Sequence, residues 1–120
     1  MAGPEPWPSP PPGIRKVADA WEWRRAIASE HGPPETLTRL VLLAMSLHMN
    51  PDGSRCFVGA RSLAAEAALN KDTVIRHRVA AVRAGWLIPP SAGRHATRQE
   101  WRPCLPPLSD QPGQWKTPAV

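Results

Sequence analysis

The 120-residue chain has no long apolar run, and none reaches the roughly 18–20 residues that a membrane-spanning helix needs. Its first residues also lack the basic and then apolar stretch that is typical of a signal peptide. These two absences predict a cytoplasmic protein that has no membrane partner.

Cysteine is scarce as well. Cys56 and Cys104 form neither a disulfide framework nor the repeated spacing of a structural metal site, and the four histidines are scattered. The chain also lacks a paired-carboxylate motif, a phosphate-binding glycine loop and a catalytic Ser/His/Asp or Cys/His arrangement. We therefore expect no enzyme activity, no cofactor and no metal, and we expect Cys56 to be a small buried apolar residue.

Proline is abundant, with 16 residues concentrated towards the two ends of the chain. Proline has no backbone N–H group to donate, so such segments form no regular secondary structure. We therefore expect disordered arms at residues 1–15 and 104–120 around one folded domain at residues 16–103. The sequence leaves open whether these arms dock a protein partner.

Four helices are predicted inside this domain, over about residues 17–30, 35–49, 60–69 and 71–84. The second has the strongest pattern, because side chains that can line a core recur at intervals of three and four residues: Leu37, Leu40, Val41, Ala44, Leu47 and His48. Further apolar residues add a second side: Leu42, Leu43, Met45 and Met49. The pattern predicts a central helix that is buried on more than one face.

The third and fourth predicted helices are joined with almost no connector. Asn70 lies between them as a natural N-cap, and Gly85 suits the left-handed residue that ends the fourth helix. Two short helices joined so closely must cross steeply, as in a helix-turn-helix. Residues 86–102 then read as a hairpin with a basic loop. The predicted fold is mainly α with a small β-hairpin wing, a winged helix-turn-helix.

The positive charge of the chain is confined to this region. Residues 1–70 hold seven Lys or Arg and seven Asp or Glu, and residues 103–120 hold one of each. Residues 71–102 hold seven basic residues against two acidic ones, so the formal net charge of +5 lies entirely there. An excess of one sign on one candidate surface indicates a polyanionic partner.

A projection at about 100° per residue selects a DNA-facing side of the fourth helix. The candidate DNA-binding residues on that helix and on the wing are Lys71, Thr73, Arg76, His77, Arg83, Arg94, His95 and Arg98. Arg76 has the geometry to read a guanine edge, Thr73 and His77 can bond a base or a phosphate, and the remaining residues reach phosphates or the minor groove. Arg78 falls near the apolar direction, so we expect its stem to pack and its guanidinium to reach the edge.

Six short motifs follow one another along residues 40–87: Leu40-Val41-Leu42, Asn50-Pro51-Asp52-Gly53, Cys56-Phe57, Leu63-Ala64, Asp72-Thr73-Val74 with Arg76-His77, and Ala84-Gly85-Trp86-Leu87. With them, the run from Glu35 to Trp101 resembles the winged helix-turn-helix domains of phage and plasmid replication proteins and related regulators. Ala68 stands where the turn of that family usually carries glycine, and a left-handed backbone at alanine costs on the order of 1 kcal/mol. The resemblance covers a little over half of the chain and implies DNA binding.

The leading hypothesis is sequence-specific binding of double-stranded DNA, as a transcriptional regulator or as the origin-binding part of a mobile-element replication protein. Two alternatives remain open at this stage: a protein-interaction adaptor built on a winged helix, and an inhibitor that blocks a nucleic-acid-binding partner. The sequence does not say whether the protein is a homodimer.

Overall fold

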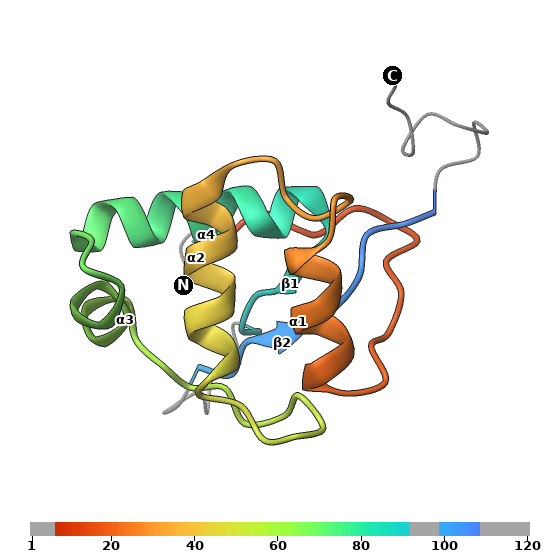
Figure 1. Ribbon diagram of the computed structural model, residues 1–120, viewed down its shortest axis with the longest axis horizontal. Coiled ribbons are helices and arrows are strands. Elements are labelled where there is room, and N and C mark those ends of the chain that lie inside the picture. Colours follow the sequence, from red (N-terminus) through yellow and green to blue (C-terminus); the bar gives the residue numbers. More distant parts are fainter. Residues whose placement is uncertain (1–6, 92–98, 109–120) are drawn as a thin grey trace, which may run out of the picture.

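The computed structural model of the chain describes residues 7–91 and 99–108. Helices α1 (Ala20–Ala28), α2 (Thr36–Ser46), α3 (Ala60–Ala67) and α4 (Lys71–Ala84) precede the strands β1 (Leu87–Ile88) and β2 (Arg102–Pro103) (Figure 1). The strands form an antiparallel hairpin in which Leu87 lies opposite Pro103. The predicted fold class, mainly α with a small β-hairpin, is confirmed.

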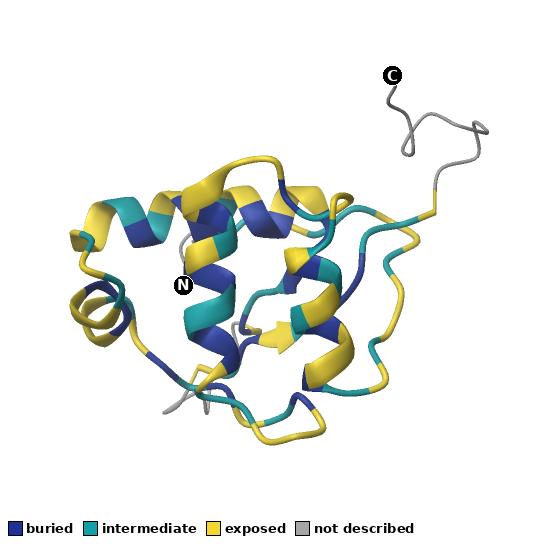
Figure 2. Ribbon diagram, in the orientation of Figure 1, coloured by how far each residue is buried: buried dark blue, intermediate teal, exposed yellow. Residues whose placement is uncertain are grey.

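The central position of α2 is also confirmed, because this helix packs against α1, α3 and α4. Its apolar residues are not all buried, however. Val41, Leu42 and Met45 lie in the core, whereas Leu37, Leu40 and Leu47 are exposed. Figure 2 shows buried and exposed bands side by side on α2. The prediction that several faces are buried is wrong, because the three neighbouring helices cover one side of α2 and leave the other open.

The link between α3 and α4 is a left-handed turn followed by a helix cap, although alanine disfavours the left-handed backbone. Ala68 adopts the left-handed conformation, with φ 58° and ψ 43°. The Asn70 side chain accepts a hydrogen bond of 2.8 Å from the backbone N–H of Thr73, which caps α4. Gly85 ends α4 with φ 91°, and a Cβ atom there would lie 3.0 Å from the Cα atom of Pro106. Glycine is therefore required at this position for both backbone conformation and space.

Tryptophans join the hairpin to the helices. Trp23 of α1 is buried, and its indole N–H donates to the carbonyl oxygens of Trp86 at 3.0 Å and Cys104 at 3.1 Å. Trp101 is also buried and pairs with Cys56 in an isolated antiparallel bridge. The hairpin is therefore part of the core, and Cys56 is the small buried residue that the sequence predicts.

The proline-rich segments differ from the expectation of disordered arms wherever the structure describes them. The backbones of Arg15 and Leu105 exchange two hydrogen bonds of 2.9 Å, and Cys104 and Leu105 are buried. The rings of Trp7 and Trp101 meet edge to face, with 4.7 Å between their centroids. Proline-rich chain can lie across the domain because its few non-proline residues supply the hydrogen bonds and the apolar anchors. Residues 1–6 and 109–120 of the predicted arms lie outside the described residues.

Candidate nucleic-acid interface

Helix α4 has one buried side and one exposed side. The buried side packs on α2 and α3 and consists of Val74, His77, Arg78, Ala81 and Val82. The exposed side carries Asp72, Arg76, Ala80, Arg83 and Ala84, and Lys71 is exposed at the first turn of the helix. Because α3 and the left-handed turn hold the amino end of α4 and the hairpin holds its carboxyl end, the exposed side is presented on a rigid support.

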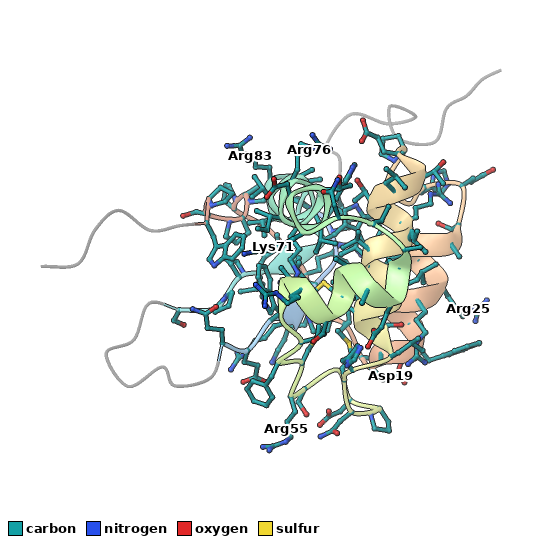
Figure 3. The ribbon with its side chains drawn as sticks, turned by 90° about the vertical axis from the view of Figure 1, so that its left-hand side faces the viewer. Asp19, Arg25, Arg55, Lys71, Arg76 and Arg83 are labelled. Atoms are coloured by element: carbon teal, nitrogen blue, oxygen red, sulfur yellow. The ribbon has the colours of Figure 1, made fainter. Side chains whose placement is uncertain are left out.

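Helix α4 carries three exposed cations, two of them on its exposed side. Figure 3 shows Arg76 and Arg83 projecting from the same edge of the helix, and Lys71 lies at its first turn. Arg76 and Arg83 are seven residues apart, which is two helical turns or about 10 Å along the axis. Among the described residues, no ion pair engages any of the three side chains. Their charges are therefore available to an anionic partner. Thr73, the fourth candidate on this helix, is half-buried.

His77 does not lie on the DNA-facing side as predicted. It is only 8% exposed, and its Nδ1 atom lies 2.8 Å from the hydroxyl oxygen of Thr38 on α2. The reason is helical geometry, since His77 follows Val74 by three residues and precedes Ala81 by four, and both of these are buried. His77 is therefore a hydrogen-bonded core residue that joins α4 to α2.

Arg78 is buried more deeply than predicted. The side chain is 2% exposed, its Nη2 atom donates to the carbonyl oxygen of Val58 at 2.7 Å, and its guanidinium carbon lies 4.5 Å from the Trp101 ring centroid. Burial lowers the pKa of Arg78 to about 10, which leaves it charged at neutral pH. Its Nε atom has no hydrogen-bond partner in the described part of the chain. The guanidinium does not reach the edge because Val58 and Trp101 hold it inside.

The remaining predicted residues, Arg94, His95 and Arg98, lie outside the described residues, between the two strands of the hairpin. The prediction for them remains untested. The structure adds Arg102, which is exposed on β2 next to Ile88 of β1. Arg102 belongs to the basic segment 71–102. The concentration of positive charge in that segment could have identified Arg102 from the sequence as a candidate DNA-binding residue.

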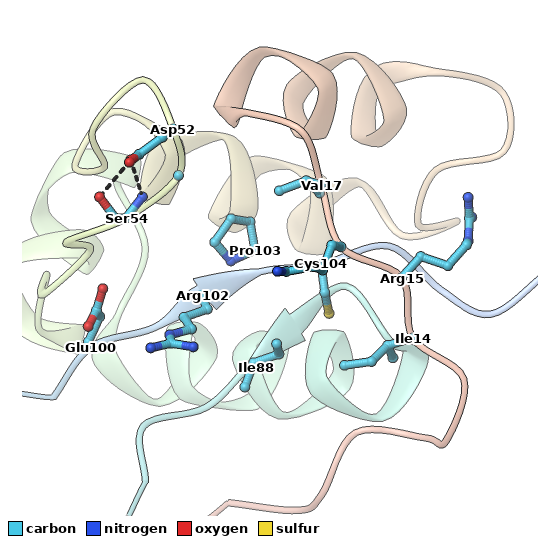
Figure 4. A pocket seen from close by; sticks show the side chains of 12 residues that line it. Ile14, Arg15, Val17, Asp52, Ser54, Ile88, Glu100, Arg102, Pro103 and Cys104 are labelled. Carbon is cyan, nitrogen blue, oxygen red and sulfur yellow. Dashed lines mark hydrogen bonds between the residues drawn. The ribbon is translucent and has the colours of Figure 1, made fainter.

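A cleft of about 270 Å³ lies beside the hairpin (Figure 4). Asp52 and Glu100 line it together with Arg102. Asp52 accepts hydrogen bonds from the hydroxyl and the backbone N–H of Ser54 at 2.6 Å and 2.9 Å, and these bonds lower the pKa of Asp52. Glu100 accepts from the backbone N–H of Arg55 at 2.9 Å. The Asp52 and Glu100 carboxylates therefore stabilise the local backbone through these hydrogen bonds.

Comparison with known proteins identifies the region that carries the exposed cations. Residues 35–87 match the model of a helix-turn-helix domain family. This match begins at the N-cap of α2 and ends in β1, so it contains the α3–α4 pair whole. The match covers less than half of the chain; it supports a helix-turn-helix domain in this region, and such a domain suggests DNA as the partner. No curated protein and no solved structure matches the chain, so the resemblance to phage and plasmid replication proteins stays a prediction.

Metal-binding and membrane-spanning features do not compete with this assignment. Over residues 7–91 and 99–108, no three His, Cys, Asp or Glu side chains gather in a group that could hold a metal ion. Within that same portion of the chain, every helix is too short or too polar to traverse a lipid bilayer.

Proposed function

We propose that this protein binds double-stranded DNA in a sequence-specific manner, with α4 as the recognition helix and the chain between β1 and β2 as a basic wing. Its role is that of a transcriptional regulator or of the origin-binding part of a mobile-element replication protein. The proposal rests on the helix-turn-helix match together with one observation: Arg76 and Arg83 share the exposed side of α4, Lys71 is exposed at its first turn, and none of the three forms an ion pair among the described residues.

Each residue on α4 has a separate proposed task. Arg76 lies in the middle of the exposed side and reads a guanine, because a guanidinium matches the two acceptors on its major-groove edge. Lys71 and Arg83 lie at opposite ends of the helix and bond phosphates. Thr73, in the first turn, bonds a base or a phosphate. His77 leaves this set and acts as a positioning residue, because it bonds Thr38 in the core.

In the wing, Arg94, His95 and Arg98 contact the flanking phosphates or the minor groove. Their positions in the sequence support this role, since they fall between two strands that the structure pairs, close to the carboxyl end of α4. Arg102 extends the same basic surface along β2.

The test is a binding selection on randomised duplexes with the wild type, Arg76→Ala and Arg83→Ala. Arg76→Ala is expected to cost about 1–3 kcal/mol on the preferred site and to relax base preference at one position. Arg83→Ala is expected to weaken all duplexes alike, since a phosphate contact carries no sequence information. Circular dichroism checks that both variants fold.

Arg25→Ala is the matched control, because Arg25 is an exposed arginine on α1 that points away from Arg76 and Arg83 (Figure 3). It removes the same charge and should leave both affinity and base preference unchanged. If the wild type has no base preference, or if Arg76→Ala keeps the wild-type motif and affinity, the assignment of α4 as the recognition helix is wrong. The interaction adaptor then becomes the better explanation.

A further inference from the structure

An apolar stripe on α2 remains uncovered by the rest of the domain. It consists of the exposed Leu37, Leu40 and the C-cap residue Leu47, which is 76% exposed, with the half-buried Ala44 between them. The intervals between these residues are three, four and three, which is the spacing of the seam between two helices in a coiled coil. The opposite side of α2 already contacts α4, so this stripe is a second packing surface without a partner among the described residues.

Two opposite charges flank the stripe. A groove of about 400 Å³ has α2 as its floor, with Arg24 of α1 and Glu66 of α3 among the residues that line it. The Nε atom of Arg24 donates to the Ser46 hydroxyl at 2.9 Å, and Glu66 lies 2.6 Å from the Nε2 atom of His48. Ser46 is the last residue of α2 and His48 lies two residues beyond it, so both charges lie near the carboxyl end of α2. Helices α1 and α3 lie on opposite sides of α2 in Figure 1, so Arg24 and Glu66 flank the stripe from opposite sides.

This arrangement is complementary to itself. A two-fold axis parallel to α2 places the α1 side of one copy against the α3 side of the other, so Arg24 meets Glu66 twice. An antiparallel arrangement would bring each charge to the opposite end of the second α2 and lose both pairs. We propose that a second copy of this chain binds the stripe, with the two α2 helices parallel.

The proposed two-fold axis also suits DNA binding by the exposed side of α4. This step rests on the proposed function. Helix α2 runs along the vertical direction of Figure 1, and Arg76 and Arg83 project at the top of Figure 3, which shares that vertical axis. A two-fold axis in this direction keeps both α4 helices on the same side of the dimer. The DNA site would then be a pair of half-sites related by a dyad.

Sedimentation velocity of the full chain without DNA tests the interface. The wild type should show a concentration-dependent dimer, and Leu47→Glu should weaken it by more than about a hundredfold, because each dimer would bury two unpaired carboxylates. Leu108→Glu is the control, since Leu108 is 65% exposed and lies off the stripe. A wild type that stays monomeric at every soluble concentration, or a dimer that Leu47→Glu leaves intact, overturns the proposal.

A charge swap tests the parallel orientation. Arg24→Glu and Glu66→Arg should each weaken the dimer by about tenfold, because each places like charges together at two points. The double variant should recover the wild-type affinity. Single variants without effect, or a double variant without recovery, overturn the parallel arrangement.

Failure of the dimer and failure of DNA binding give different results. Leu47→Glu leaves the exposed side of α4 untouched, so it should bind an isolated half-site as well as the wild type and lose only the added affinity for a two-fold site. A wild-type dimer that binds no DNA would refute the proposed function while it supports the interface.

Discussion

Replacement of Arg78 by methionine tests how a lone buried cation affects this fold. The guanidinium donates to the Val58 carbonyl and lies over the Trp101 ring, and no carboxylate pairs with it among the described residues. Methionine keeps an unbranched stem of similar reach and removes the charge. Arg78→Met therefore separates the effect of the charge from the effect of packing.

The expected change in the free energy of unfolding follows from opposing contributions. Burial lowers the pKa of Arg78 from 12.5 to about 10, which at about 1.4 kcal/mol per pKa unit disfavours the charged form by about 3 kcal/mol. Against this, a hydrogen bond from a charged donor contributes about 1.5–3 kcal/mol and a desolvated contact with an aromatic ring about 2 kcal/mol. The difference leaves about 0.5–2 kcal/mol in favour of the guanidinium, so Arg78→Met should lose no more than about 2 kcal/mol, because replaced buried charges often cost little. Arg78→Ala should lose about 2–5 kcal/mol, because it also leaves a cavity.

Urea unfolding at neutral pH measures both variants. Arg78→Met has a second expected result, since it removes a positive charge from α4 without changing the surface: the salt dependence of DNA binding should equal that of the wild type. Arg76→Ala should flatten that dependence. If Arg78→Met is as unstable as Arg78→Ala, the guanidinium stabilises the fold by more than its burial costs, and the reasoning is refuted.

Three other results are expected. With Arg94 and Arg98 both replaced by alanine, the plot of log affinity for DNA against log salt should flatten by about 0.9 for each phosphate that the wing no longer neutralises, and an unchanged slope would remove the wing from the interface. Trp7→Ala should lower the free energy of unfolding by at least about 0.5–1.5 kcal/mol, measured in urea, because it removes the edge-to-face packing on Trp101; equal stability would show that Trp7 does not pack there. Burial raises the pKa of the Cys104 thiol to about 12, so the unfolded chain loses this proton first and stability should fall between about pH 9 and pH 12, by up to about 1.4 kcal/mol per pH unit. Cys104→Ser should remove that share of the alkaline loss in thermal melts across this range, and an identical decline in the variant would assign the loss to other groups.

Features that depend on neighbouring residues in the chain could be predicted from the sequence. Asn70 caps α4 and Gly85 ends it because their side-chain and backbone preferences act within one helical turn. Ala68 is an exception, because alanine does not favour the left-handed backbone that it adopts between the two helices. The order of the helices, the hairpin and the basic segment followed from such local signals.

Features that depend on distant packing could not be predicted in this way. His77 shares a side of α4 with the buried Val74 and Ala81, but only the tertiary structure shows that Thr38 on α2 lies where it can bond the imidazole. The packing of Trp7 on Trp101 could not be predicted either, because a proline-rich sequence does not show which distant side chain it will contact.

For α2, the sequence determined that the residues form a helix with apolar side chains on most of its circumference, because spacing along the chain fixes which side chains share a side. It could not determine which side would be buried, since a periodic pattern does not include the neighbours that exclude water. Only the tertiary structure, by placing α1, α3 and α4 around α2, decided that Val41, Leu42 and Met45 form the core and that Leu37, Leu40 and Leu47 remain exposed.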